Sequence, residues 1–169
     1  QVSASPDQLK NCKEILRKKC SQATFDGCLT FVIGENGMDL AMKYGLPVNQ
    51  IIKTGNWLGP LLVAAAENSV KKLLLFGYHG KLIKLSGGIF HTHHHLADGR
   101  IEILTSLAVR EDISFELIQL ISRSTSVENA LLTLEARNPE AVSLIWGRMA
   151  KEIEIKSRNY INRYLSSSM

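Results

Sequence analysis

The sequence predicts an α/β fold: a doubly wound, Rossmann-like parallel sheet with flanking helices, followed by a helical C-terminal region. Short apolar segments that end at glycine alternate with segments of helical spacing three times, over residues 29–44, 50–69 and 71–86. Helical connections imply parallel strands, and a parallel sheet needs helices on both faces. After Arg100 the apolar spacing is helical throughout, which predicts the C-terminal region.

The length of 169 residues is that of one domain. We expect a single α/β domain over 1–169, with strand–turn–helix units and their site turns in 1–99 and a helical covering region in 100–169. A hydrophobic content of 45% and a charged content of 21% are typical of a soluble globular protein. No apolar run reaches the roughly 20 residues that span a bilayer, and no signal peptide is evident. We therefore expect a cytoplasmic protein without a membrane partner.

The formal net charge of +4 is mild, and acidic residues interrupt the basic ones. Nucleic-acid binding is not expected, because there is no basic stripe with base-stacking aromatic residues. A positive surface does suit an anionic small molecule. Cys12, Cys20 and Cys28 are an odd set without C-x-x-C spacing, which favours reduced, structural cysteines.

The first half of the chain is expected to begin with a helix. Ser5, Pro6 and Asp7 form a helix start, and apolar residues then recur every three or four positions to about residue 21. The β-branched and aromatic run 29–33 predicts a buried strand that ends at Gly34. A turn and a short helix over 38–44 follow, and Gly45 closes that helix.

Two further strand–turn–helix units follow. Residues 50–53 predict a brief strand, residues 54–56 a polar turn, and residues 57–69 a helix with proline in its first turn. Residues 71–76 predict a strand that stops at Gly77, and residues 81–85 a helix with both of its lysines on one side. Beyond Arg100 we expect four helices that cover the sheet or contact a partner, over 101–108, 115–121, 126–134 and 139–165.

The turns after the three strands are expected to form one cleft, because ligands of open α/β sheets bind where parallel strands end. These turns hold Glu35 and Asn36, residues 54–56, and residues 79–81. An acid just past a strand can bind ribose hydroxyls or simply cap the next helix, so the residue type leaves the role of Glu35 open. Gly77, Gly80 and Lys81 lack the spacing of a nucleotide-triphosphate loop.

All five histidines lie between positions 79 and 95. His91, His93 and His95 alternate, so an extended segment would place them on one face. Imidazole is a common metal ligand, but it also lines pockets for anions or lies on the surface. The spacing alone leaves these three interpretations open.

The run GYHGKLIKLSGGIFHTHHHLADGR at 77–100 resembles the signature of the CbiD family of cobalt-precorrin-5B C(1)-methyltransferases. The run FVIGENGMDLA at 31–41 and the residues at 51–56 also resemble that family. Tyr78 followed by His79, and Ser86 in place of a usual alanine, depart from the family pattern. Members of the family are longer, so the resemblance implies that the chain is a C-terminal fragment.

The resemblance implies methylation of cobalt-precorrin-5B at ring carbon C-1 in anaerobic cobalamin biosynthesis, with S-adenosylmethionine as methyl donor. The partner would be an anionic cobalt-tetrapyrrole, and no protein-bound metal is expected. It implies His93 and Asp98 as catalytic residues. It implies that the methyl donor is bound by Gly34, Glu35, Asn36, Thr54 and Asn56. It implies that the substrate is bound by His79, Gly80, Lys81, Lys84, His91, Thr92 and Arg100.

Two alternatives remain open at this stage. One is a non-catalytic module that binds a corrin or another anion, and the other is a histidine-based metalloenzyme. The sequence also allows a homo-oligomer, and it leaves open which half of a family chain binds the methyl donor.

Overall fold

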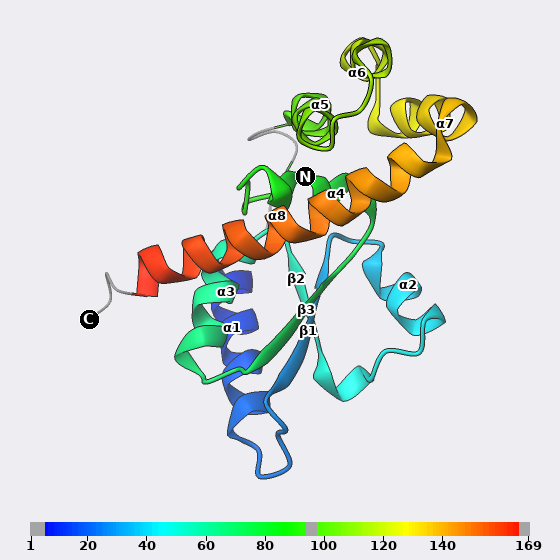
Figure 1. Cartoon of the computed structure of the whole chain (residues 1–169). Helices are drawn as coiled ribbons and strands as arrows, with labels where there is room; N and C mark the ends of the chain where they lie inside the picture. Colours follow the sequence, from blue (N-terminus) through cyan, green and yellow to red (C-terminus); the bar gives the residue numbers. More distant parts are fainter. Residues whose placement is uncertain (1–5, 94–97, 166–169) are drawn as a thin grey trace.

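The computed structural model describes residues 6–93 and 98–165, and its centre is a three-stranded sheet with the order β2-β1-β3 (Figure 1). The central strand is β1 (Cys28–Ile33), flanked by β2 (Ile51–Gly55) and β3 (Lys72–Phe76). Both pairings are parallel, and Thr30 lies opposite Ile51 on one side and Leu74 on the other. The structure therefore confirms the predicted parallel sheet and supplies the strand order.

Helices cover both faces of β1, which confirms the doubly wound prediction. On one face α1 (Pro6–Ser21) and α3 (Leu58–Glu67) pack on Phe31 and its neighbours in the main core. On the other face α2 (Gly37–Lys43) packs on Val32 in a smaller cluster with Ala41. Burial on both sides explains why β1 is apolar almost throughout rather than alternating.

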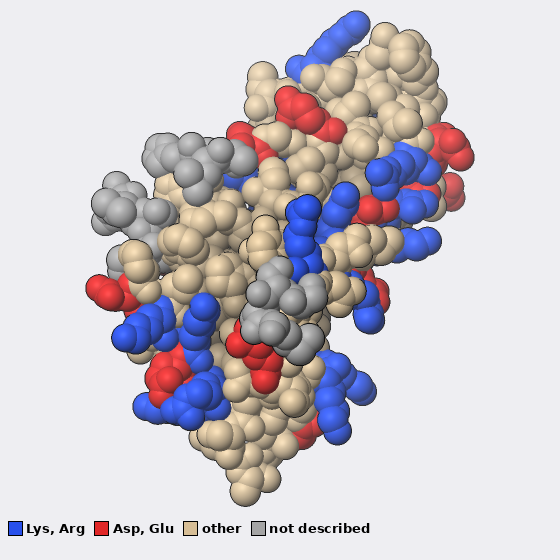
Figure 2. Space-filling model, turned by 90° about the vertical axis from the view of Figure 1, so that its left-hand side faces the viewer, with Lys and Arg blue, Asp and Glu red and all other residues tan. Residues whose placement is uncertain are grey.

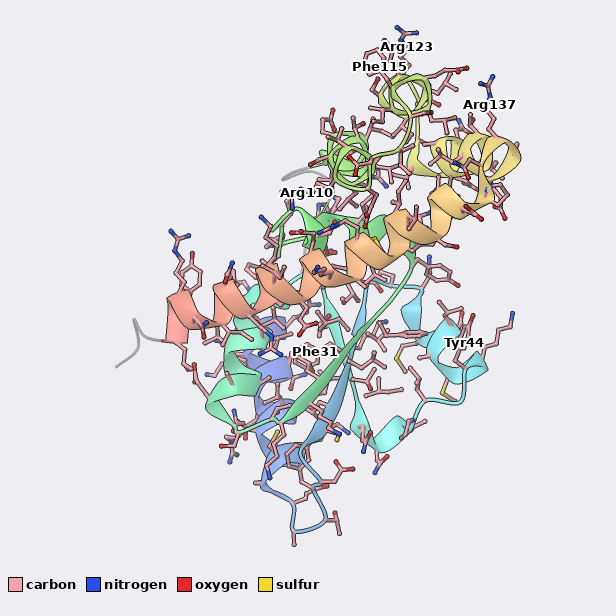
Figure 3. All side chains as sticks on the ribbon, in the orientation of Figure 1. Phe31, Tyr44, Arg110, Phe115, Arg123 and Arg137 are labelled. Atoms are coloured by element: carbon pink, nitrogen blue, oxygen red, sulfur yellow. The ribbon has the colours of Figure 1, made fainter. Side chains whose placement is uncertain are left out.

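The carboxyl end of the sheet is covered by α4 (His79–Ser86) and the long α8 (Pro139–Leu165), as Figure 1 shows. Beyond them lie α5 (Arg100–Arg110), α6 (Phe115–Ser122) and α7 (Val127–Arg137), which form the predicted helical region. Figure 3 shows Phe115, Arg123 and Arg137 at the outer end of this region. None of the described helices is both long and apolar enough to cross a membrane.

Two bounds differ from the sequence expectation near the carboxyl end of the sheet. Helix α4 begins at His79 instead of residue 81, because Tyr78 adopts an extended backbone and precedes the first turn. Strand β2 continues to Gly55, after a single 3-10 turn, η1 (Val48–Gln50). Thr54 is therefore a strand residue and not part of a polar turn.

Helix α8 joins the helical region to the α/β layer. The Arg110 guanidinium of α5 donates to the Glu152 carboxylate at 2.7 Å, and Arg148 donates to Glu111 at 3.2 Å. Further along α8, the Tyr160 ring lies 4.9 Å from the Phe90 ring, measured between centroids. The two parts of the molecule thus pack on one continuous helix.

Candidate functional site

A pocket of about 350 Å³ lies at the carboxyl ends of β1 and β3. The turn after β1 supplies one wall and the start of α4 supplies the other, while Arg100 at the start of α5 completes the rim. This is the edge at which open parallel sheets bind ligands. The lining residues are Ile33, Gly34, Glu35, Asn36, Tyr78, Gly80, Lys81, Lys84 and Arg100.

Three cationic side chains reach this pocket, and one acid accompanies them. The cations are Lys81, Lys84 and Arg100, and the acid is Glu35. The Glu35 carboxylate is exposed and lies 3.5 Å from the ammonium of Lys53, so another lysine already offsets its charge. The pocket is therefore positive overall. Over the face shown in Figure 2, Lys and Arg are interleaved with Asp and Glu, so no uninterrupted basic stripe is seen there.

The two lysines of α4 converge on one backbone oxygen. The ammonium of Lys81 donates to the Thr92 carbonyl at 3.1 Å, and that of Lys84 donates to the same oxygen at 3.0 Å. They are three positions apart on the helix, which places them on one side, as the sequence predicted. Lys84 is only 1% exposed, so its charge has lost nearly all of its contact with water.

Burial and like charges lower the pKa of both lysines. For Lys84 desolvation is the main cause, and the nearby charges of Lys81 and Arg100 add to it, while Asp98 opposes them. For Lys81 desolvation again dominates and Arg100 adds to it, while Glu35 opposes. An anion in the pocket would offset this repulsion, so the electrostatics favour an anionic ligand.

Thr92 links this pair of lysines to the turn after β2. Its hydroxyl donates to the side-chain oxygen of Asn56 at 2.8 Å, and its backbone N–H donates to the Asn56 carbonyl at 3.2 Å. Thr92 is fully buried. Its side chain and that of Asn56 therefore contact each other, and neither lines the pocket.

Asp98 forms an ion pair with Arg100 across the start of α5. The Arg100 Nε donates to the Asp98 Oδ1 at 2.7 Å, and this hydrogen bond is the main reason that the pKa of Asp98 falls to about 2. The carboxylate is thus ionised at neutral pH and is a weak base. In turn, the pairing raises the pKa of Arg100.

The other residues predicted for the site do not line the pocket. Thr54 is buried and its hydroxyl donates to the Val32 carbonyl at 3.2 Å. The His79 ring lies 6.0 Å from the Trp146 ring, and the His91 ring lies edge-on 4.5 Å from the Trp57 ring. The Nδ1 atom of His91 is buried without a hydrogen-bond partner among the described residues.

His93 is partly exposed, next to Thr92, whereas His94 and His95 lie outside the described residues. Within 6–93 and 98–165, no group of three or more His, Cys, Asp or Glu side chains could hold a metal ion.

Two pocket residues, Ile33 and Tyr78, were not predicted from the sequence. Ile33 directly precedes Gly34, and Tyr78 directly follows Gly77. This position next to a glycine that ends a strand is the sequence feature that could have identified them.

The chain matches known proteins along its full length. A family model described as "CbiD, C-terminal domain" matches residues 91–167. The cobalt-precorrin-5B C(1)-methyltransferase of Prochlorococcus marinus strain NATL1A is 89% identical over all 169 residues, which are 44% of that relative. The enzyme of the same name from strain MIT 9303 is 55% identical over 169 residues, again 44% of its length.

The chain thus spans less than half the length of these curated relatives. No solved structure matches it. The identity covers the whole chain, including the pocket and the helical region, and the matching family model is that of a C-terminal domain. The chain is therefore similar over its whole length to the C-terminal part of these methyltransferases, and its residues 91–167 match the C-terminal domain of CbiD.

Proposed function

We propose that the chain is part of a cobalt-precorrin-5B C(1)-methyltransferase that uses S-adenosylmethionine, and that its pocket binds carboxylates of the tetrapyrrole substrate. The observation that carries this proposal is the convergence of Lys81, Lys84 and Arg100 on one pocket. Hydrogen bonds from cations to carboxylates are short and strong, and burial strengthens them further. The names of the relatives supply the reaction and the substrate.

Methyl transfer to a ring carbon breaks the bond between the sulfonium sulfur and the methyl carbon and forms a carbon–carbon bond. S-adenosylhomocysteine leaves, and positioning of the two reactants dominates the acceleration. In this proposal Lys81 and Arg100 fix the macrocycle by its acidic side chains. Lys84 is too buried to be a main contact, and it contributes positive charge from behind the pocket wall.

The methyl donor itself fits this pocket poorly. Its sulfonium is positively charged, and three cations would repel it. Glu35 is the one acid among the described residues that line the pocket, and Gly34 and Asn36 lie beside it, so ribose binding by this turn stays a prediction. The roles predicted for Thr54 and Asn56 would require that their side chains be accessible to the methyl donor. Instead, Thr54 is hydrogen-bonded to Val32 and Asn56 to Thr92.

Of the two residues predicted to handle a ring proton, His93 is the better candidate. Asp98 is held as a weakly basic carboxylate by Arg100, whereas histidine is the side chain that most often acts as a general acid or base. We expect His93→Ala at the matching position of a full-length relative to slow methylation about 100-fold or more. Wild-type turnover by that variant would remove His93 from the reaction.

Binding of a polycarboxylate porphyrin such as uroporphyrin to this chain tests the pocket assignment. Isothermal titration calorimetry should give one saturable site, and Lys81→Met should weaken binding about tenfold or more, since one charged hydrogen bond is lost. Lys151→Met removes an exposed lysine of α8 and is the matched control. Equal affinity of Lys81→Met and the control would contradict the assignment.

The same substitution separates catalysis from simple ligand binding. In a full-length relative, Lys81→Met at the matching position should lower the methylation rate at subsaturating substrate as much as it lowers affinity. If porphyrin binding falls while methylation is unchanged, the pocket is a binding module apart from the reaction. Titration of the chain with S-adenosylhomocysteine, with a chelator present, tests separately whether the donor binds here.

A further inference from the structure

Strand β3 has an apolar sequence, but the described residues cover it only in part. Its sequence is KLLLF, yet each of its five residues is partly or fully exposed, and Leu74 is 46% exposed. The central strand β1, by contrast, is buried at nearly every position. Parallel sheets are normally covered on both faces, so an exposed apolar strand within one indicates that a covering element is missing.

The exposed side of β3 is the face that carries α2. Leu74 pairs with Thr30, and Phe76 pairs with Val32, so Leu74 and Phe76 point to the same side as Val32. Helix α2 packs on β1 there and leaves Leu74 in the open. The edge of β3 away from β1 has no strand partner among the described residues.

The surface continues beyond the carboxyl end of the strand, around Phe76. Tyr44, at the end of α2, is 70% exposed and its ring lies 6.0 Å from that of Phe76. Figure 3 shows Tyr44 beside α2, away from Phe31 in the main core. Tyr78 is 45% exposed and also lines the pocket. We define the β3 face as Tyr44, Leu74, Phe76 and Tyr78.

We propose that the β3 face binds the N-terminal part of the CbiD family chain, which thereby also covers one side of the pocket. More than half of each relative lies outside the matched region, so a long segment of the same chain is available to cover this surface. Helix α1 runs antiparallel to β1 and begins at the carboxyl end of the sheet, where the pocket lies (Figure 1). The residues that precede the matched region in the relatives therefore enter at the same end of the sheet as the pocket.

The shape of this surface suits such a partner. A strand with one free edge and apolar side chains on its open face can accept a further strand or helix, and left uncovered it invites aggregation. Tyr78 belongs to both the β3 face and the pocket lining, so a partner that covers the whole β3 face also reaches the rim of the pocket. This inference rests on the similarity to these longer relatives and on the exposure of β3, and it does not depend on the proposed reaction.

Amide hydrogen exchange, followed by mass spectrometry, tests the proposal. The 169-residue chain and the full-length relative from strain NATL1A are compared peptide by peptide. We expect peptides over 72–78 to exchange about tenfold more slowly, or slower still, in the full-length protein, because their amides become covered. Residues 115–122 serve as the internal control, since Phe115 is 72% exposed at the outer end of the helical region. Their exchange should be equal in the two proteins.

Three results would overturn the proposal. Equal exchange over 72–78 in the two proteins would mean that β3 stays uncovered in the full-length chain. Equal slowing of 72–78 and 115–122 would indicate general stabilisation and no specific contact. Protection that appears only as protein concentration rises would assign the surface to a second copy of the chain.

A variant gives an independent readout. Leu74→Lys at the matching position of the full-length relative should restore fast exchange over 72–78, since a charged side chain cannot be buried in that contact without a large cost. In the 169-residue chain the same substitution should leave the melting temperature nearly unchanged, because Leu74 is already exposed. If Leu74→Lys leaves the full-length exchange pattern as it was, the β3 face is not the contact.

Discussion

Replacing Lys84 by methionine should leave the protein as stable as before or more stable. Lys84 is buried, and its ammonium donates to the Thr92 carbonyl at 3.0 Å. Such a charged hydrogen bond contributes about 1.5–3 kcal/mol. The effective cost of burying an ammonium is several kcal/mol, and the charges of Lys81 and Arg100 add repulsion. Because methionine keeps most of the side-chain length, little packing is lost.

The Thr92 carbonyl keeps a hydrogen-bond donor when Lys84 is replaced. Lys81 still donates to the Thr92 oxygen at 3.1 Å, so this buried acceptor keeps a partner. We therefore expect Lys84→Met to gain on the order of 1 kcal/mol at pH 7, which for a chain of this size is about 2–4 °C in melting temperature. Thermal and urea unfolding, with Lys151→Met as an exposed control, measure this difference.

The pH dependence supplies a second check. The pKa of Lys84 is lower in the folded protein than in the unfolded chain, where it is near 10.5, so the unfolded state binds more protons between these values. Wild-type stability should therefore rise, relative to the variant, as pH increases toward 10.5. The gap between the two proteins should narrow over that range. A fall in melting temperature of more than about 4 °C for Lys84→Met at pH 7 would refute the reasoning, because the hydrogen bond would then outweigh desolvation.

Three further predictions concern other contacts. Thr92→Val removes a hydroxyl that donates to the partly buried amide oxygen of Asn56, and should cost about 1–3 kcal/mol in urea unfolding; an unchanged midpoint would contradict this. The Asp98 carboxyl should titrate by NMR near pH 2, and Arg100→Gln should return its pKa toward 3.8; the stabilisation from this pair is present above pH 3.8 and is lost as pH falls through 2. Gly59→Ala would place a methyl group against the Tyr160 ring, and should cost about 1–3 kcal/mol unless that ring is also made smaller.

Much of the fold could be predicted because its signals are local. Each strand is a short apolar run that ends at glycine, and each helix has its own apolar spacing, so the order of elements follows from neighbouring residues. The shared side of Lys81 and Lys84 follows in the same way, from a three-residue step on one helix. The parallel direction follows from the helical connections between strands.

Most of the pocket residues were predicted, but which of the three turns line the pocket could not be, because that depends on strand order. With β1 in the centre, the turns after β1 and β3 line one pocket, while the turn after β2 lies across β1 from α4. Thr92 then fills the space between them and binds Asn56 on one side and two lysines on the other. These partners are distant in sequence, and no periodicity links them. A polar side chain that can bind a ligand can equally bind another polar side chain. Thr92 and Asn56 were predicted as ligand contacts, and they bind each other instead.

Because α8 packs on both the helical region and the α/β layer, its length limits which insertions and deletions the protein can accept. The helix is 27 residues long, about 40 Å, and it buries one stripe that includes Ala141, Ile145, Met149 and Ile153. Inserting or deleting one residue midway would turn one half of that stripe by about 100° relative to the other. The helical region and the sheet could then no longer both contact it. Point substitutions on the exposed side of α8 should therefore be tolerated more readily than a change in its length.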